Sequence, residues 1–262
     1  MVHSLPSVPD SFRWSEETWG AGLRCVPLET LAPHVFTTRQ LQLSSAADER
    51  LLGAAVGAER VAMLTQVHGA DVVAVRPGEW PERSQTGDAL ISRQPVVAVA
   101  VRVADCAPVL LADRATGAVA AVHAGWRGTA AGVARAAVDA LGREYGSRPS
   151  DLVVAIGPSI GSCCYEVGSK LVDAFAAAGH ARSLIDRWFI AAPPPRGSRE
   201  RSPLRLDVAG ANRDQLVLAG VPEEQIHMSG LCTAMHLDVL TSFRAERSQS
   251  GRIAAAIRAS RP

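Results

Sequence analysis

Lysine, aromatic residues and long apolar runs are all scarce in this chain of 262 residues. Lys170 is its only lysine, so a mechanism through a lysine Schiff base would depend on that single residue. The formal net charge of +1 argues against nucleic acid or a membrane surface as the main partner. The longest apolar runs, such as residues 96–101, are far shorter than the roughly 20 residues that cross a bilayer.

Cysteines are few, and their spacing does not indicate disulfides. Five are present, an odd number without a repeated interval, at Cys25, Cys106, Cys163, Cys164 and Cys232. The adjacent pair at 163 and 164 is interpreted as packing residues. Residues 1–10 lack the basic start and apolar run of a secretory signal. We therefore expect a cytoplasmic protein in a reducing compartment.

Short apolar runs rich in valine dominate the middle of the chain, and Gly, Asp or Pro residues bound them. Such runs are typical of strands buried on both faces. They predict strands at residues 71–75, 96–103, 108–111, 118–122 and 152–156.

Helical patterns lie between and after the apolar runs, at residues 129–145, 171–178 and 207–220, with Asp207 as a candidate N-cap. Strands and helices alternate only in part, which predicts an α/β architecture with mixed β-sheets. No shift in composition marks a boundary, so residues 1–262 are expected to form one domain. The Pro-rich residues 192–203 are predicted to be a surface loop.

Polar residues follow or precede three of the predicted strands, where side chains of α/β proteins reach a common crevice. His68, Cys106 and His123 lie in these segments and would supply two imidazoles and one thiolate. Catalytic zinc uses three protein ligands of this kind and keeps a fourth position for water or substrate. The spacings of 38 and 17 residues exclude a local zinc knuckle. The alternative is two hydrogen-bonded turn histidines and a small buried cysteine.

The residues after His123 suggest an anion site. Arg127, Gly128 and Thr129 are predicted to begin a helix, whose free N–H groups and guanidinium could hold phosphate. In the alternative, Thr129 only caps the helix and Arg127 is solvated. Asp88 and Asp105 are the carboxylates best placed for proton transfer or for orienting a metal ligand, although either could be a turn residue.

Several ordered motifs resemble one known family, the YfiH-type family, over residues 61–257. They are QVHGADVV (66–73), GDALIS (87–92), ADCAPVLLAD (104–113), AVHAGWRG (121–128), IGPSIGSCCYEVG (156–168), LDVAGANRDQL (206–216) and SFR…SGR (242–252). The resemblance implies zinc held by His68, Cys106 and His123. It also implies an α/β sandwich similar to the cytotoxic necrotizing factor catalytic domain.

The same resemblance implies a zinc-dependent purine nucleoside phosphorylase. Its substrates would be phosphate and adenosine, inosine or methylthioadenosine, with adenosine deamination as a side activity. We assign catalytic roles to Asp88, Asp105 and Arg127 on this reading. Substrate-binding roles are assigned to Arg39, Gly128, Thr129 and Arg244.

The chain departs from the family pattern in two places, which bear on the substrate. The family usually has a Gly-Gly-x-Ser loop after an FTTR-like segment, whereas here Arg39 is followed by Gln-Leu-Gln-Leu-Ser. Residues 240–246 read Leu-Thr-Ser-Phe-Arg-Ala-Glu, where the family more often has aromatic residues and paired arginines. Three alternatives therefore stay open: a zinc amidase that edits a muropeptide precursor, a polyphenol oxidase with copper, and a metal-binding protein without enzymatic activity.

Overall fold

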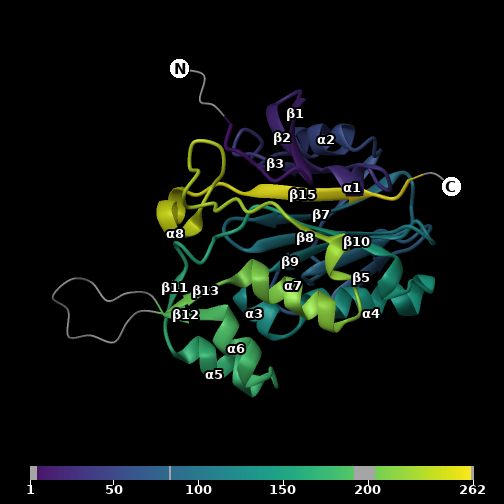
Figure 1. Ribbon diagram of the computed structural model, residues 1–262. Helices are drawn as coiled ribbons and strands as arrows, with labels where there is room; N and C mark the ends of the chain where they lie inside the picture. The colour runs from purple at the N-terminus through teal and green to yellow at the C-terminus, as the bar shows by residue number, and fades with distance from the viewer. Residues whose placement is uncertain (1–4, 83, 192–203, 261–262) are drawn as a thin grey trace.

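The computed structural model describes residues 5–82, 84–191 and 204–260, so the predicted loop at 192–203 lies outside the described residues. Two six-stranded sheets lie face to face in it (Figure 1). The first sheet has the order β1 (Phe12–Glu17), β2 (Gly20–Cys25), β3 (His34–Thr37), β15 (Ile253–Arg258), β7 (Val97–Val103) and β4 (Arg60–Ala62).

The second sheet carries most of the predicted strands. Its order is β14 (Ile226–Met228), β10 (Leu152–Ile156), β8 (Ala107–Asp113), β9 (Val119–Ala124), β6 (Ala89–Ser92) and β5 (Val72–Val75). The outer pairs β10–β14 and β5–β6 are parallel, while the central pairs are antiparallel. In the first sheet β4 and β7 are parallel and the other pairs antiparallel. The prediction of an α/β protein with mixed sheets is confirmed.

The valine-rich runs have no polar alternation because both faces of these strands are covered. Leu110 of β8 packs with Val99 and Val101 of β7 in the layer between the sheets. The next residue along β8, Leu111, belongs instead to the layer between the second sheet and its helices. Since successive strand side chains point to opposite faces, each strand must be apolar at every position to fill both layers.

Helices close the two outer faces (Figure 1). Leu52 of α2 (Ala46–Ala55) packs against Ala98 and Ala100 on the outer face of the first sheet. The second sheet is covered by α3 (Trp126–Ala130), α4 (Val133–Tyr145) and α7 (Val208–Leu218). The remaining elements are α1 (Val26–Glu29), α5 (Lys170–Ala177), α6 (Arg182–Trp188), α8 (Phe243–Glu246), short 3-10 turns, and a small sheet of β11 (Glu166–Val167), β13 (Leu204–Leu206) and β12 (Phe189–Ala191).

Two of the three helix predictions agree with the structure to within about two residues. Asp207 is the N-cap of α7, where its carboxylate accepts a hydrogen bond of 2.9 Å from the amide of Gly210. The prediction of one continuous helix over 129–145 is wrong. The chain forms α3 and α4 separately, because Gly132 adopts a left-handed conformation with φ of 78° between them. Among the described helices, none has the length and apolar content to cross a membrane.

Candidate functional site

The β8–β9 hairpin brings the cysteine and one histidine of the predicted metal set together. In its antiparallel register Pro108 lies opposite His123, so Cys106, two residues before Pro108, lies beside the end of β9. The ring of His68 packs edge-on against His123 with centroids 4.8 Å apart. Ligand atoms of His68, Cys106 and His123 all lie within 4.8 Å of one another. The structure thus brings the three predicted ligands into one group.

Asp88, which precedes β6, connects two of these ligands. Its Oδ1 accepts hydrogen bonds from Nδ1 of His123 at 2.7 Å and from the amide of His68 at 2.9 Å. Its Oδ2 accepts from the amide of Gly69 at 2.6 Å and from that of Val67 at 3.3 Å. Because a carboxylate only accepts, Nδ1 of His123 must carry a proton, which leaves Nε2 as the ligand atom.

Protonation equilibria within the group favour a thiolate. Burial alone would raise the pKa of Cys106, but hydrogen bonds and charge from His123 and His68 outweigh it and lower this pKa to about 7. Burial would lower the pKa of His123, yet its bonds to Asp88 and Cys106 raise that pKa to about 9. Burial likewise opposes ionisation of Asp88, while the bonds from His123, Gly69 and His68 lower its pKa. At neutral pH the metal-free group therefore pairs a protonated His123 with the carboxylate of Asp88, and a metal ion would have to displace the proton from Nε2 of His123.

The backbone around the group leaves no space for larger side chains. A Cβ on Gly125 would lie 2.8 Å from Sγ of Cys106 and 3.1 Å from the ring of His68. His68 itself has a φ of 62°, a strained value for a residue other than glycine. The three amide bonds to Asp88 hold this turn in place. The local folding of residues 67–69 is thus set by the same carboxylate that orients His123.

Both carboxylate oxygens of Asp105 are engaged in hydrogen bonds within the protein. Its φ of 84° is in the left-handed region. One carboxylate oxygen accepts a hydrogen bond of 2.6 Å from the hydroxyl of Thr233, and the other accepts one of 2.6 Å from the amide of Arg244. Its carbonyl accepts from the amide of Ile160 at 2.9 Å. Asp105 therefore fastens three loops next to Cys106.

The residues predicted to bind an anion occupy different surroundings. Arg127 is exposed at the start of α3, with its guanidinium 4.3 Å from the centre of the Trp126 ring. Gly128 is buried, and a Cβ there would lie 2.9 Å from the carbonyl oxygen of Gly69. Thr129 does not begin the helix, since α3 starts at Trp126.

The polar groups of Thr129 are already used within the protein. Its hydroxyl accepts a hydrogen bond of 2.9 Å from Asn212, and its carbonyl accepts one of 2.9 Å from Gln215. Its amide donates to the carbonyl of Gly125 at 2.8 Å. These bonds attach α3 to α7. Gly128 and Thr129 therefore place α3, and Arg127 is the member of this segment whose side chain is available.

The two arginines predicted to bind substrate also make hydrogen bonds within the protein. Arg39 donates to the carbonyl of Leu237 and, at 3.0 Å, to Glu246, so it mainly fixes the C-terminal loop. Arg244 donates to the carbonyl of Glu166 at 2.8 Å, and its guanidinium lies 5.1 Å from the centre of the Tyr165 ring.

The sequence suggests residues 157–166 as a substrate-contacting loop but assigns no role to Tyr165 itself, which lies near Cys106 and Asp105 in the structure. Burial, together with the nearby charges of Cys106 and Asp105, raises the pKa of Tyr165 to about 12, although the charges of Arg244 and Arg127 oppose this shift. Its hydroxyl thus stays protonated and lies among the charged groups of the site. The available signal was its place at the end of the glycine-rich segment 157–166, directly after two cysteines.

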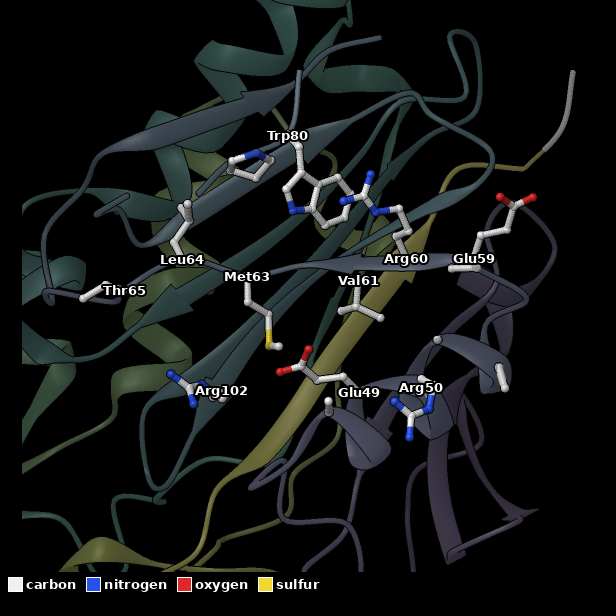
Figure 2. Close-up of a pocket in the computed structure, with 15 residues that line it drawn as sticks. Glu49, Arg50, Glu59, Arg60, Val61, Met63, Leu64, Thr65, Trp80 and Arg102 are labelled. Carbon is white, nitrogen blue, oxygen red and sulfur yellow. The ribbon is translucent and has the colours of Figure 1, made fainter. Parts of the chain in front are cut away.

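A hollow of about 510 Å³ lies away from this group, between α2 and β4 (Figure 2). Trp80 and Arg60 border one side, with the guanidinium 3.6 Å from the ring centre, and Glu49 and Arg50 of α2 border the other. Its lining contains none of the predicted site residues. The metal-ligand group is instead an open surface site, with His68 exposed, Cys106 half-buried and His123 buried.

The stacked mixed sheets define the class to which this protein belongs, an α/β protein with the YfiH-like fold. The crystal structure of YlmD from Geobacillus stearothermophilus superimposes with a TM-score of 0.81 at 30% identity, over 97% of this chain and 100% of that one. A family model described as "Multi-copper polyphenol oxidoreductase laccase" matches residues 35–260. The chain belongs to this family, which contains the YfiH and YlmD proteins.

Relatives with named activities include phosphorylases and a deaminase. A purine nucleoside phosphorylase of Deinococcus radiodurans is 36% identical over 86% of this chain and 88% of its own length. A purine nucleoside phosphorylase of Bacteroides thetaiotaomicron is 37% identical over 65% of this chain, and the match spans 60% of that protein. Adenosine deaminase RL5, from an unknown prokaryotic organism, is 36% identical over 63% of this chain and 59% of its own length.

Proposed function

We propose that this protein is a zinc-dependent purine nucleoside phosphorylase whose metal is bound by His68, Cys106 and His123. The observation that carries the proposal is the convergence of these three ligands on one point, with Asp88 orienting His123 and positioning the turn of His68. Relatives named as purine nucleoside phosphorylases support the substrate class.

The donor set fits zinc. Two imidazoles and one thiolate with an open fourth position are a ligand set of catalytic zinc sites. A type of copper site for electron transfer shares these ligands, but phosphorolysis and deamination involve no electron transfer to a metal. When bound, zinc supplies a Lewis acid that polarises an oxygen or lowers the pKa of a water molecule.

The side chains around the ligands have complementary tasks. The exposed guanidinium of Arg127, in the first turn of α3 just after the strand of His123, provides paired N–H donors for phosphate. Arg244, whose guanidinium lies 5.1 Å from the centre of the Tyr165 ring, adds a second positive charge. The protonated Tyr165 hydroxyl can donate to a ribose or phosphate oxygen. We propose a positioning role for Asp105, because its hydrogen bond from the amide of Arg244 holds α8 next to the segment of Cys106.

Phosphate is the nucleophile in the proposed reaction. Its oxygen attacks C1′ of the nucleoside while the bond from C1′ to the purine nitrogen breaks. The purine leaves with the bonding electron pair and takes up the proton that the hydrogen phosphate releases, which yields ribose 1-phosphate and the free base. The arginines neutralise the incoming charge and hold it in line with the leaving base. Deamination of adenosine is proposed as a side activity because adenosine deaminase RL5 is a relative.

The test is chromatography of the products from adenosine over a series of phosphate concentrations. We expect adenine and ribose 1-phosphate to increase with phosphate, and inosine to form without it. Arg127→Ala should reduce kcat/KM for phosphate roughly tenfold to a hundredfold, because a hydrogen bond to a charged group contributes about 1.5–3 kcal/mol. Arg135→Ala is the matched control, since Arg135 is an exposed arginine of α4 paired with Asp139.

Two outcomes would contradict the proposal. In the first, the protein does not convert adenosine but releases an amino acid from a muropeptide precursor, which would favour the amidase. The other is an Arg127→Ala variant with an unchanged phosphate dependence.

A further inference from the structure

A second group of metal-ligating side chains lies outside the site described above. The Sγ atoms of Cys163, Cys164 and Cys232 all lie within 4.8 Å of one another, and all three are free thiols. The interpretation of the adjacent pair as packing residues holds for Cys164, which contacts the core, but is wrong for Cys163, whose side chain is exposed. The cluster therefore reaches from the core at Cys232 to the surface at Cys163.

The backbone holds the three thiols in place before any ligand arrives. Ser159 exchanges hydrogen bonds with both neighbours of Cys232, at 3.2 Å to Leu231 and 3.0 Å to Thr233. The other two cysteines lie in the turn after β10, which the amide of Cys164 closes by donating to the carbonyl of Gly161 at 3.0 Å. Convergence of the sulfur atoms is thus built into two fixed segments, so little ordering is needed on binding.

Gly161 contacts the thiol cluster in two ways. Its amide donates to Sγ of Cys232 at 3.2 Å, which fixes the position of this sulfur atom. A Cβ at this position would lie 3.2 Å from Sγ of Cys163 and 3.3 Å from Cβ of Cys232. Glycine therefore lets the turn approach the cysteines closely enough for the amide to reach the sulfur.

The spacing of the sulfur atoms allows a metal site. With metal–sulfur bonds of about 2.3 Å, three thiolates around one ion lie roughly 3.8–4.0 Å apart, and the three sulfur atoms here all lie within 4.8 Å of one another. A disulfide would need two of the sulfur atoms to approach to about 2.05 Å. A ligand set made only of sulfur selects soft cations, above all Cu⁺. Cys232 also borders a cavity of about 140 Å³, and Met228 is among the residues that line it.

We propose that Cys163, Cys164 and Cys232 form a second metal site, which binds one soft cation of the Cu⁺ type through three thiolates. It shares no ligand with the group of His68, Cys106 and His123. The two sites are nevertheless connected, because Thr233, next to Cys232, donates to the carboxylate of Asp105, next to Cys106. A cation at the thiol cluster would stiffen the loops that position the first site.

The test uses the Cys106→Ser protein, in which the first site has lost its thiolate and the second is intact. Anaerobic titration with Cu⁺ against a competing chelator measures affinity, and the ultraviolet thiolate-to-copper band shows sulfur ligation. We expect one Cu⁺ per chain. Adding Cys163→Ser should weaken binding by about a hundredfold or more, since losing a ligand costs more than losing an outer partner. Adding Cys25→Ser instead is the matched control, because Cys25 is a buried cysteine on the first sheet.

Exposure of Cys163 keeps the test interpretable, since serine there leaves the core unchanged. Equal Cu⁺ affinity in the variants with and without Cys163 would overturn the proposal. So would a thiol count that falls by two in metal-free protein and recovers with a reductant, because that result assigns the cluster to disulfide chemistry. Neither result depends on nucleoside turnover, so the proposed function stands or falls separately.

Discussion

Replacing Asp88 by asparagine tests how the first site is held together. The carboxylate accepts four hydrogen bonds, from the ring of His123 and from three consecutive amides at residues 67–69. Asparagine keeps one accepting oxygen, so the oxygen that now serves Gly69 and Val67 would become an NH₂ group facing two N–H donors. The negative charge that balances the metal would also be lost.

The expected effect on metal binding is large. Outer partners of metal ligands usually contribute tenfold to a hundredfold in affinity, and here one residue orients two ligands, so we expect about a hundredfold loss of zinc affinity. This corresponds to about 2.7 kcal/mol of binding free energy. Competition with a chromophoric chelator measures the zinc affinity, and circular dichroism verifies that the variant is folded.

Asp113→Asn is the matched control for this experiment. Asp113 has the same exposed fraction of 1% and also binds backbone amides, those of Ala115 and Thr116, but it lies at the other end of β8. Its substitution should lower stability and leave zinc affinity unchanged. A folded Asp88→Asn protein with zinc affinity within about twofold of the wild type would refute the assignment of Asp88.

Two further predictions follow from close packing and from burial. Gly125→Ala should reduce zinc affinity by more than about tenfold, because its Cβ would lie 2.8 Å from Sγ of Cys106. Gly168→Ala, where a Cβ meets open space, is its control, and equal losses in both variants would argue against a steric cause. Burial lowers the pKa of His34 from 6.5 to about 4, and its Nε2 accepts from the amide of Cys25. The unfolded chain therefore takes up this proton first, and the free energy of unfolding should fall by about 2 kcal/mol between pH 7 and pH 5. Denaturant titration across this range measures the loss, and a His34→Gln variant with the same pH dependence would contradict it.

Strand positions were predictable because burial on both faces leaves a direct mark on the sequence. The runs at 96–103 and 152–156 contain almost only apolar residues, since each side chain enters one of two packed layers. The helix break was harder to see. Gly132 interrupts an alanine-rich pattern that otherwise suits a helix, and only the left-handed conformation at this glycine separates α3 from α4.

The convergence of His68, Cys106 and His123 was predictable from their positions at strand ends and from the motifs around them. Their supporting contacts were not, because these join distant segments. Asp88 meets residues 67–69 and 123, while Asp105 meets Thr233 and Arg244, more than a hundred residues later. The thiol cluster was missed for the same reason, since Cys232 lies far along the chain from the adjacent pair. The sequence also could not show that neighbouring elements enclose Gly128 and Thr129, because these contacts arise from tertiary packing.

The register of the β8–β9 hairpin determines when a metal can be bound. Side chains alternate between the faces of a strand, so a slip of one residue would direct His123 away from Cys106. His68 joins them only after its turn has closed on Asp88, at the edge of β6. A partly folded chain therefore offers at most isolated ligands, and tight binding has to wait until the second sheet is complete. Uptake of the proposed metal should therefore come late in folding, after the second sheet has formed, and its rate would report when that sheet closes.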